Sequence, residues 1–166
     1  MSKKKILILG ATGFIGRNSA EYFAGQAGYE VYGPCFSSPP LNQANIQMQQ
    51  ADLTKQEDVD RVVRGMDVVI QAAAVTSGIK DVADSPHSFI SDNAVMNSLV
   101  FRSAFEHSVS NTILLSCTVM YQSSGTPLKE SDFDANEEMY PSYFGGAWNK
   151  VYFEKMCEFY SRQSSG

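Results

Sequence analysis

Gly10-Ala11-Thr12-Gly13-Phe14-Ile15-Gly16 is the stretch that decides the fold of this chain. It directly follows a short apolar run at 5–10, KILILG, which is typical of a strand buried on both faces. In such a turn Gly10 permits a sharp bend, Gly13 lets a pyrophosphate approach the backbone, and Gly16 lets a helix pack closely on the strand. The free N–H groups and positive dipole end of that helix then face the phosphates. The stretch therefore predicts a dinucleotide site.

The rest of the chain alternates regularly between strand and helix patterns. Strands are expected at 5–10, 29–36, 46–50, 67–72 and 111–117, and helices at 14–25, 55–64, 87–107 and 147–162. The apolar faces expected to be buried are Ile15, Tyr22 and Phe23 in the first helix, Ile90, Ala94, Phe101, Ala104 and Phe105 in the third, and Val151, Phe153, Met156, Cys157 and Tyr160 in the last. Such alternation predicts the α/β class, with a Rossmann-type, doubly wound parallel sheet and right-handed crossovers.

Composition excludes several function classes. The 166 residues are 43% hydrophobic with a formal net charge of −5, as expected for one globular domain without a nucleic-acid-binding surface. Cys35, Cys117 and Cys157 are widely spaced and odd in number, which fits neither a disulfide framework nor a zinc site. His87 and His107 lack carboxylates at metal-binding spacing, so no metal is expected. Because the apolar runs are too short for a signal peptide or a membrane span, we expect a cytoplasmic protein without a membrane partner.

The G-A-T-G spacing of the turn resembles that of the short-chain dehydrogenase/reductase superfamily. The resemblance implies an NAD or NADP cofactor, with the pair Asp52-Leu53 contacting adenine and Ala72-Ala73-Ala74 lying along the cofactor. It also implies that the turn itself binds the cofactor, through Gly10, Thr12, Gly13, Phe14, Ile15 and Gly16. From the residues alone, Asp52 is equally well interpreted as a helix cap close to Thr54.

The sequence leaves the choice between NAD and NADP open. An acidic residue at the end of the second strand would bind the ribose 2′-hydroxyl, and an arginine would bind a 2′-phosphate. Ser37 and Ser38 follow this strand instead, and serines are compatible with either cofactor. Ser37 is therefore a candidate ribose contact, and Arg17 is either a phosphate contact or a solvated helix residue.

The segment after the fourth strand narrows the resemblance. Ala72-Ala73-Ala74 followed by Gly78-Ile79, Pro86, Phe89-Ile90 and Asn93 resembles the extended, nucleotide-sugar type of the NAD-dependent epimerase/dehydratase family, most closely the GDP-fucose synthase pattern. The resemblance implies a nucleotide-sugar substrate and a Tyr/Lys/Ser catalytic set, and it leaves a homodimer open. Family members continue with further strands. We therefore expect 1–166 to be the N-terminal, NAD(P)-binding part of a larger fold, with the C-terminal strands and substrate region outside it.

The catalytic tyrosine is the first departure from the family pattern. Lys150 takes the place of the family lysine, but Gly146 stands four residues earlier, where the tyrosine belongs. Tyr143 lies seven residues before Lys150, about 10 Å along a regular helix, whereas a spacing of four gives about 6 Å. Since Gly145 and Gly146 weaken a helix, either Tyr143 sits in a loop that folds back over Lys150 or the proton-transferring phenol is absent.

The hydroxyl of the catalytic set also differs. Counting back four residues from Tyr121 gives Cys117, which is a weaker hydrogen-bond donor than serine or else a small buried hydrophobe. Strand alternation places Ser116 and Thr118 on the opposite face, and a twist at the strand end would bring Thr118 into the site. Lys150, Tyr143, Cys117 and Thr118 are thus the candidate catalytic residues.

Three functions remain open at this point: the cofactor part of a nucleotide-sugar enzyme, a non-catalytic NAD(P)-binding module, and a fragment without function. Lys150 favours the first, and Gly146 with Cys117 favours the second. We expect that these 166 residues alone turn over no substrate, because the groups that position the sugar in the family lie beyond them.

Overall fold

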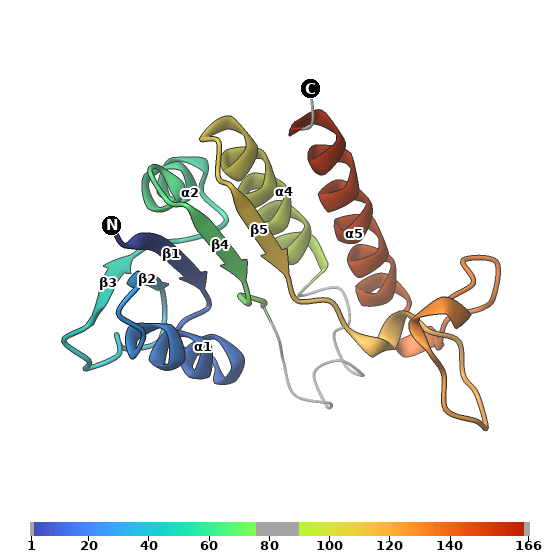
Figure 1. Ribbon diagram of the computed structural model, residues 1–166. Coiled ribbons are helices and arrows are strands. Elements are labelled where there is room, and N and C mark those ends of the chain that lie inside the picture. Colours follow the sequence, from blue (N-terminus) through green and yellow to red (C-terminus); the bar gives the residue numbers. More distant parts are fainter. Residues whose placement is uncertain (1, 76–89, 165–166) are drawn as a thin grey trace.

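The computed structural model describes residues 2–75 and 90–164 and contains a five-stranded, wholly parallel sheet with strand order β3-β2-β1-β4-β5 (Figure 1). The strands are β1 (Lys4–Leu9), β2 (Tyr29–Cys35), β3 (Ile46–Gln50), β4 (Val68–Gln71) and β5 (Asn111–Leu114). The helices are α1 (Phe14–Ala24), α2 (Gln56–Val63), α4 (Ile90–Glu106) and α5 (Phe144–Ser164). The predicted Rossmann-type architecture is confirmed.

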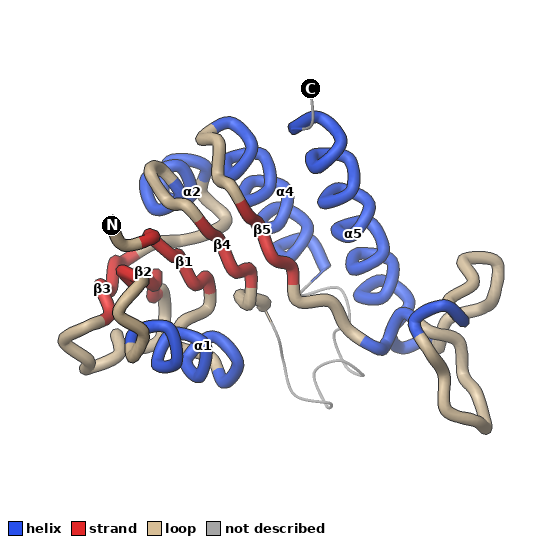
Figure 2. The backbone as a smooth tube through the Cα atoms, viewed as in Figure 1, coloured by secondary structure: helices blue, strands red, loops and turns tan. Residues whose placement is uncertain are grey.

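The sheet separates two layers of helices, with α1 against one face and α2, α4 and α5 against the other (Figure 2). Alternate residues of β1 supply the two cores, because successive side chains of a strand point to opposite faces. Ile6 and Ile8 pack on the α1 side with Ala20, whereas Leu7 and Leu9 pack with the helices on the other side. β1 is therefore buried on both faces, as its apolar run predicts.

The expected apolar face of α1 is partly wrong. Ile15 and Tyr22 are 56% and 63% exposed, and the residues buried in this helix are Gly16 and Ala20. Small residues bring the helix so close to the sheet that the bulky ones on either side remain outside. Phe105 of α4 is exposed as well.

Two element boundaries near the candidate site also differ from expectation. β5 ends at Leu114 rather than at 117, because the N–H of Leu115 makes the last bond to β4, 3.3 Å to the carbonyl of Gln71. α5 begins at Phe144 rather than at 147 and contains both glycines. A Cβ on Gly145 would lie 2.2 Å from Cδ1 of Ile90, so this glycine permits close contact between α5 and α4. The other shared boundaries agree within one or two residues; 87–89 of the third predicted helix lie outside the described residues.

The segment between β5 and α5 extends beyond the C-terminal end of the sheet (Figure 1). It contains three short 3-10 turns, η1 (Thr118–Met120), η2 (Glu130–Asp132) and η3 (Pro141–Tyr143). Met120 and Met139 attach it to α5 by packing against Ala147 and Val151. In the part of the chain that the structure describes, no helix has the length and apolarity needed to cross a membrane.

Candidate functional site

The glycine turn between β1 and α1 has the close contacts that its sequence predicts. Gly10 adopts φ +76°, and a Cβ there would lie 2.7 Å from Cα of Ala73. A Cβ on Gly16 would lie 2.1 Å from the carbonyl oxygen of Gly10. Both positions therefore exclude a side chain for structural reasons. Gly13 is different, because its Cβ would lie 3.3 Å from the same oxygen, which is tight but close to ordinary contact.

The first turn of α1 offers uncapped N–H groups. Gly13 is the N-cap residue and supplies no side-chain acceptor, and the first backbone bond of the helix runs from the N–H of Arg17 to the carbonyl of Gly13, 2.8 Å. The N–H groups before Arg17 thus have no partner within the helix, which suits a pyrophosphate. The residues at this turn fit the dinucleotide implied by the sequence. Arg17 itself pairs with Glu21 at 2.7 Å on the exposed face of the helix, in agreement with its interpretation as a solvated residue.

Asp52 closes the turn that precedes α2. Its carboxylate accepts hydrogen bonds from the N–H of Thr54 at 3.0 Å and from the Thr54 hydroxyl at 2.6 Å, and these bonds lower the pKa of Asp52. The N-cap residue of α2 is Lys55 and has no side-chain cap bond, so the helix-cap interpretation of Asp52 is wrong: its bonds stabilise the turn before the helix. Leu53 packs against the core, and Ser37 is exposed just beyond β2. Contact of these three residues with adenine or ribose stays a prediction.

A chain of amide side chains holds the segment that follows β4. Gln71 is 2% and Asn97 3% exposed, and Nε2 of Gln71 donates to Oδ1 of Asn97 at 3.1 Å. Oε1 of Gln71 accepts from the N–H of Ala73 at 3.1 Å. The Asn93 side chain bonds both the N–H and the carbonyl of Val75, at 3.0 and 2.8 Å. Sequence reasoning missed Gln71 and Asn97; a polar residue at the end of an otherwise apolar strand was the available signal.

The side chain of Lys150 reaches from α5 to Leu115, the residue that follows β5. Its Nζ donates to the carbonyl oxygen of Leu115 at 2.8 Å, and the side chain is half-buried between α5 and that segment. Burial lowers the pKa of Lys150, while the nearby Cys117 and Glu154 partly oppose this shift. Lys150 thus faces inward at the C-terminal edge of the sheet, and its role toward a nicotinamide ribose stays a prediction.

The other candidate catalytic residues differ in where they lie relative to Lys150. Tyr143 lies in η3, with its ring 5.6 Å from the ring of Tyr140, and no hydrogen bond joins it to Lys150 within the described residues. Cys117 is half-buried close to Lys150, and Thr118 is exposed at the start of η1. Because β5 has already ended, the strand alternation expected for residues 116–118 does not hold.

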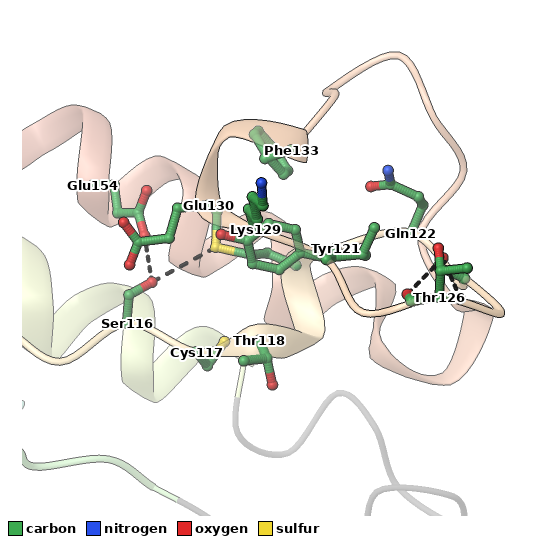
Figure 3. Close-up of a pocket in the computed structure, with 13 residues that line it drawn as sticks. Ser116, Cys117, Thr118, Tyr121, Gln122, Thr126, Lys129, Glu130, Phe133 and Glu154 are labelled. Carbon is green, nitrogen blue, oxygen red and sulfur yellow. Dashed lines mark hydrogen bonds between the residues drawn. The ribbon is translucent and has the colours of Figure 1, made fainter.

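A pocket of about 890 Å³ opens beside Cys117 and Thr118 (Figure 3), and neither Tyr143 nor Lys150 is among the residues that line it. Its walls come from the segment between β5 and α5 and from α5 itself, and include Ser116, Cys117, Thr118, Tyr121, Lys129, Glu130, Phe133 and Glu154. The hydroxyl of Ser116 donates to the carboxylate of Glu154 and so joins the strand end to α5. No cluster of metal-ligating side chains occurs in residues 2–75 and 90–164.

Comparison with known proteins agrees with this geometry. The family model described as "NAD dependent epimerase/dehydratase family" matches residues 6–166. The chain belongs to this family. Among curated relatives, the GDP-L-fucose synthase of Azorhizobium caulinodans is 34% identical over 164 residues, which are 94% of this chain and 46% of the relative. The chain thus spans about half the length of the curated relative it matches.

Solved structures of other proteins superpose closely on the chain. A GDP-D-glycero-L-gluco-heptose synthase from Campylobacter jejuni, determined in the presence of NADPH, matches with a TM-score of 0.79 and 21% identity over 98% of this chain and 45% of the other. A UDP-glucuronic acid 4-epimerase from Bacillus cereus, in complex with NAD, matches with a TM-score of 0.74 and 20% identity over 95% and 52%. These similarities confirm the fold.

The position of Lys150 in this epimerase/dehydratase domain leads to a first prediction. Glu154→Gln removes an anion that raises the pKa of Lys150 but keeps an oxygen that accepts from Ser116, so the pKa of Lys150 should fall further. The ammonium is then lost at lower pH. Because the folded pKa lies below the unfolded one, stability increases as pH rises between the two values, and the variant widens this window.

NMR titration of the lysine side-chain carbons measures this shift directly. Glu158→Gln is the matched control, because Glu158 lies on the same helix but pairs with Lys155 and Arg162 at the surface. A Lys150 pKa unchanged in Glu154→Gln would contradict the arrangement described here.

Proposed function

We propose that this chain is the cofactor-binding part of an NAD(P)-dependent epimerase, dehydratase or reductase that acts on a nucleotide sugar. The observation that carries the proposal is the convergence of three segments at one edge of the parallel sheet. The glycine turn follows β1, Ala72–Ala74 follow β4, and the Lys150-bound segment at 115–118 follows β5. Ligands of such sheets bind at the carboxyl ends of the strands.

The residues at this edge would divide the work between binding and positioning. The backbone of the glycine turn would hold the pyrophosphate, and the inward-facing Lys150 would bind the nicotinamide ribose. A bound nicotinamide would supply the redox chemistry. Cys117 or Thr118 would donate a hydrogen bond to the reacting sugar oxygen from the wall of the pocket. The names of the relatives, a GDP-L-fucose synthase and a UDP-glucuronic acid 4-epimerase, support a nucleotide sugar as the substrate class.

A second function, a dinucleotide-binding module without turnover, is favoured by the position of Tyr143. Its ring packs on Tyr140, and Gly146 leaves the family's tyrosine position empty. Proton transfer by a positioned side chain contributes about 10²–10⁴-fold in rate, so its loss would silence an otherwise intact site.

Two measurements on the protein separate these functions. Calorimetric titration with NAD and with NADP tests the cofactor site, and a panel of nucleotide sugars with nicotinamide absorbance as the readout tests turnover. These 166 residues alone are expected to turn over no substrate under either function, so turnover is measured on any longer form encoded by the same gene. In that form, binding with turnover supports the enzyme, and binding without turnover supports the module. Failure of both dinucleotides to bind would refute both functions.

The outer surface of α4 and α5 supports a homodimer. Phe105, Tyr152 and Phe159 are exposed there, and Tyr160 packs against both phenylalanine rings, 5.3 Å from each. Apolar surface of this kind is favourably buried between copies of a chain. We predict that Phe159→Asp shifts the protein to monomers in light scattering. The control Tyr22→Asp changes an exposed aromatic on α1 and should leave the assembly unchanged; dissociation by both variants alike would contradict this interface.

The proposed location is the cytoplasm. Cys35, Cys117 and Cys157 are all free thiols. Free thiols persist in a reducing compartment.

A further inference from the structure

Two buried amides lie behind the edge of the sheet that would bind the cofactor, called here the cofactor edge. The function proposed above gives them no role. Gln71 is the last residue of β4, and Asn97 faces it from α4, with both side chains buried. Burial of an amide is costly unless its polar atoms are paired. Here they are paired in series: Gln71 donates to Asn97, and Asn97 donates at 2.8 Å to the carbonyl of Asn93 one turn earlier in α4.

These amides determine where the backbone runs after β4. The N–H of Ala72 still bonds β1, at 3.2 Å to the carbonyl of Leu9, and is the last ladder bond of that pair. The next N–H, that of Ala73, bonds the side chain of Gln71 instead, and Asn93 bonds Val75 through both of its polar atoms. Side chains, and not a neighbouring strand, therefore fix the path of residues 73–75.

This path matters because it forms one side of the glycine turn. A Cβ on Gly10 would lie only 2.7 Å from both N and Cα of Ala73, so the two backbones are in direct contact. A displacement of Ala73 by a fraction of an ångström would therefore alter the space in front of α1. The amide chain thus reaches from the core of α4 to the surface that would hold a dinucleotide.

We propose that Gln71 and Asn97 are positioning residues, which hold the segment after β4 against the glycine turn and so preorganise the dinucleotide site. The inference rests on the proposed function, because the backbone that these residues would position is the part that would bind the cofactor. It adds two residues that make no contact with the cofactor themselves. Their action runs through the N–H of Ala73.

The test compares stability with affinity in a double variant. Gln71→Met keeps the length of the side chain and removes its polar atoms, and Asn97→Leu does the same for its partner. Replacing both members of a buried pair by apolar groups of similar shape costs less than removing one. We expect the melting temperature of the double variant to lie above that of Gln71→Met. Its affinity for NAD or NADP should nevertheless stay lowered by about tenfold or more, as in Gln71→Met, because Ala73 has lost its acceptor in both.

Ser103→Ala provides the matched control. Ser103 is also a buried polar residue of α4, but its hydroxyl bonds Asp60 at 2.7 Å on the side of α2. This variant should lose stability and retain its affinity within about twofold, since the cofactor edge is untouched. Amide hydrogen exchange supplies a readout that needs no ligand. The N–H of Ala73 should exchange about tenfold faster in Gln71→Met than in Ser103→Ala at matched stability.

Each outcome decides the matter. Lowered affinity that fails to recover in the double variant, together with fast exchange at Ala73, supports the inference. Wild-type affinity in the double variant, or unchanged exchange at Ala73, overturns the inference alone. Failure of the unmodified protein to bind either dinucleotide refutes the proposed function, and the inference is overturned with it.

Discussion

Gly13→Val is expected to abolish dinucleotide binding while leaving the fold intact. A Cβ at this position would lie 3.3 Å from the carbonyl of Gly10, a distance that a slight shift relieves. The two added methyl groups would then stand in front of the first N–H groups of α1, where the pyrophosphate belongs. Loss of a favourable N-cap residue should cost about 1 kcal/mol of stability. Calorimetry with NAD and NADP measures the binding, and a thermal melt confirms that the variant is folded.

Gly28→Val is the matched control, because a Cβ on Gly28 meets no heavy atom within 4 Å. It introduces the same side chain in open space, so the protein should bind as before. Equal binding by Gly13→Val and the unmodified protein would show that the pyrophosphate is not held at this turn.

The other two glycines of the turn are poorer tests of binding. Gly10 has φ +76° and touches Ala73, and Gly16 touches the carbonyl of Gly10 with no room for any side chain. Substitution at either position should disturb the packing of α1, β1 and the end of β4 together. A loss of binding there would not separate the site from the fold. Gly13 is informative because the backbone tolerates a side chain that a phosphate would not.

The main features of the fold could be predicted from the sequence because they depend on local patterns. These patterns are the apolar run of β1, the three glycines of the turn and the alternation of strands with helices. They specify a parallel sheet without any knowledge of which distant residues are in contact. The face that α1 buries could not be predicted in the same way. Hydrophobicity indicated Ile15 and Tyr22, but the close approach of the helix selects Gly16 and Ala20.

The candidate site was less predictable, because its contacts join distant parts of the chain. The place of Lys150 followed from its spacing to the family motif, but its bond to Leu115 spans 35 residues. The pair Gln71 and Asn97 is 26 residues apart, and each residue alone is ordinary in a sequence. The end of β5 at Leu114 depends on the backbone bonds of β4, so alternation could not be extended to Cys117 and Thr118.

Gly146→Tyr, which supplies the phenol that the family pattern has at this position, is the second change with a large expected effect. α5 begins at Phe144, so Gly146 and Lys150 lie four residues apart within one helix. Side chains at this spacing share a face at about 6 Å along the axis. Gly146→Tyr should therefore place a phenol beside the Lys150 ammonium, which lowers the pKa of a phenol toward neutrality. If the rest of the site is complete, turnover of a nucleotide sugar should rise by roughly 10²–10⁴-fold.

The measurement compares the 166-residue chain and any longer form encoded by the same gene, with nicotinamide absorbance as the readout. Gly146→Phe is the control, because it adds the same ring without the hydroxyl and should give no gain. We expect no turnover by the 166 residues alone, with or without the tyrosine, since poor positioning of the sugar can by itself cost orders of magnitude.

Tyr143→Phe decides between the two remaining sources of the proton. The Tyr143 ring packs against that of Tyr140, and among the described residues no hydrogen bond joins Tyr143 to Lys150, so deletion of its hydroxyl should leave the activity of a longer form unchanged. A large loss in Tyr143→Phe would show instead that the η3 turn folds over Lys150 when substrate is bound. Turnover in an unmodified longer form that survives Tyr143→Phe would leave the proton to a group on the pocket wall. Cys117 and Thr118 are the candidates already placed there, and Cys117→Ala and Thr118→Val would then distinguish them.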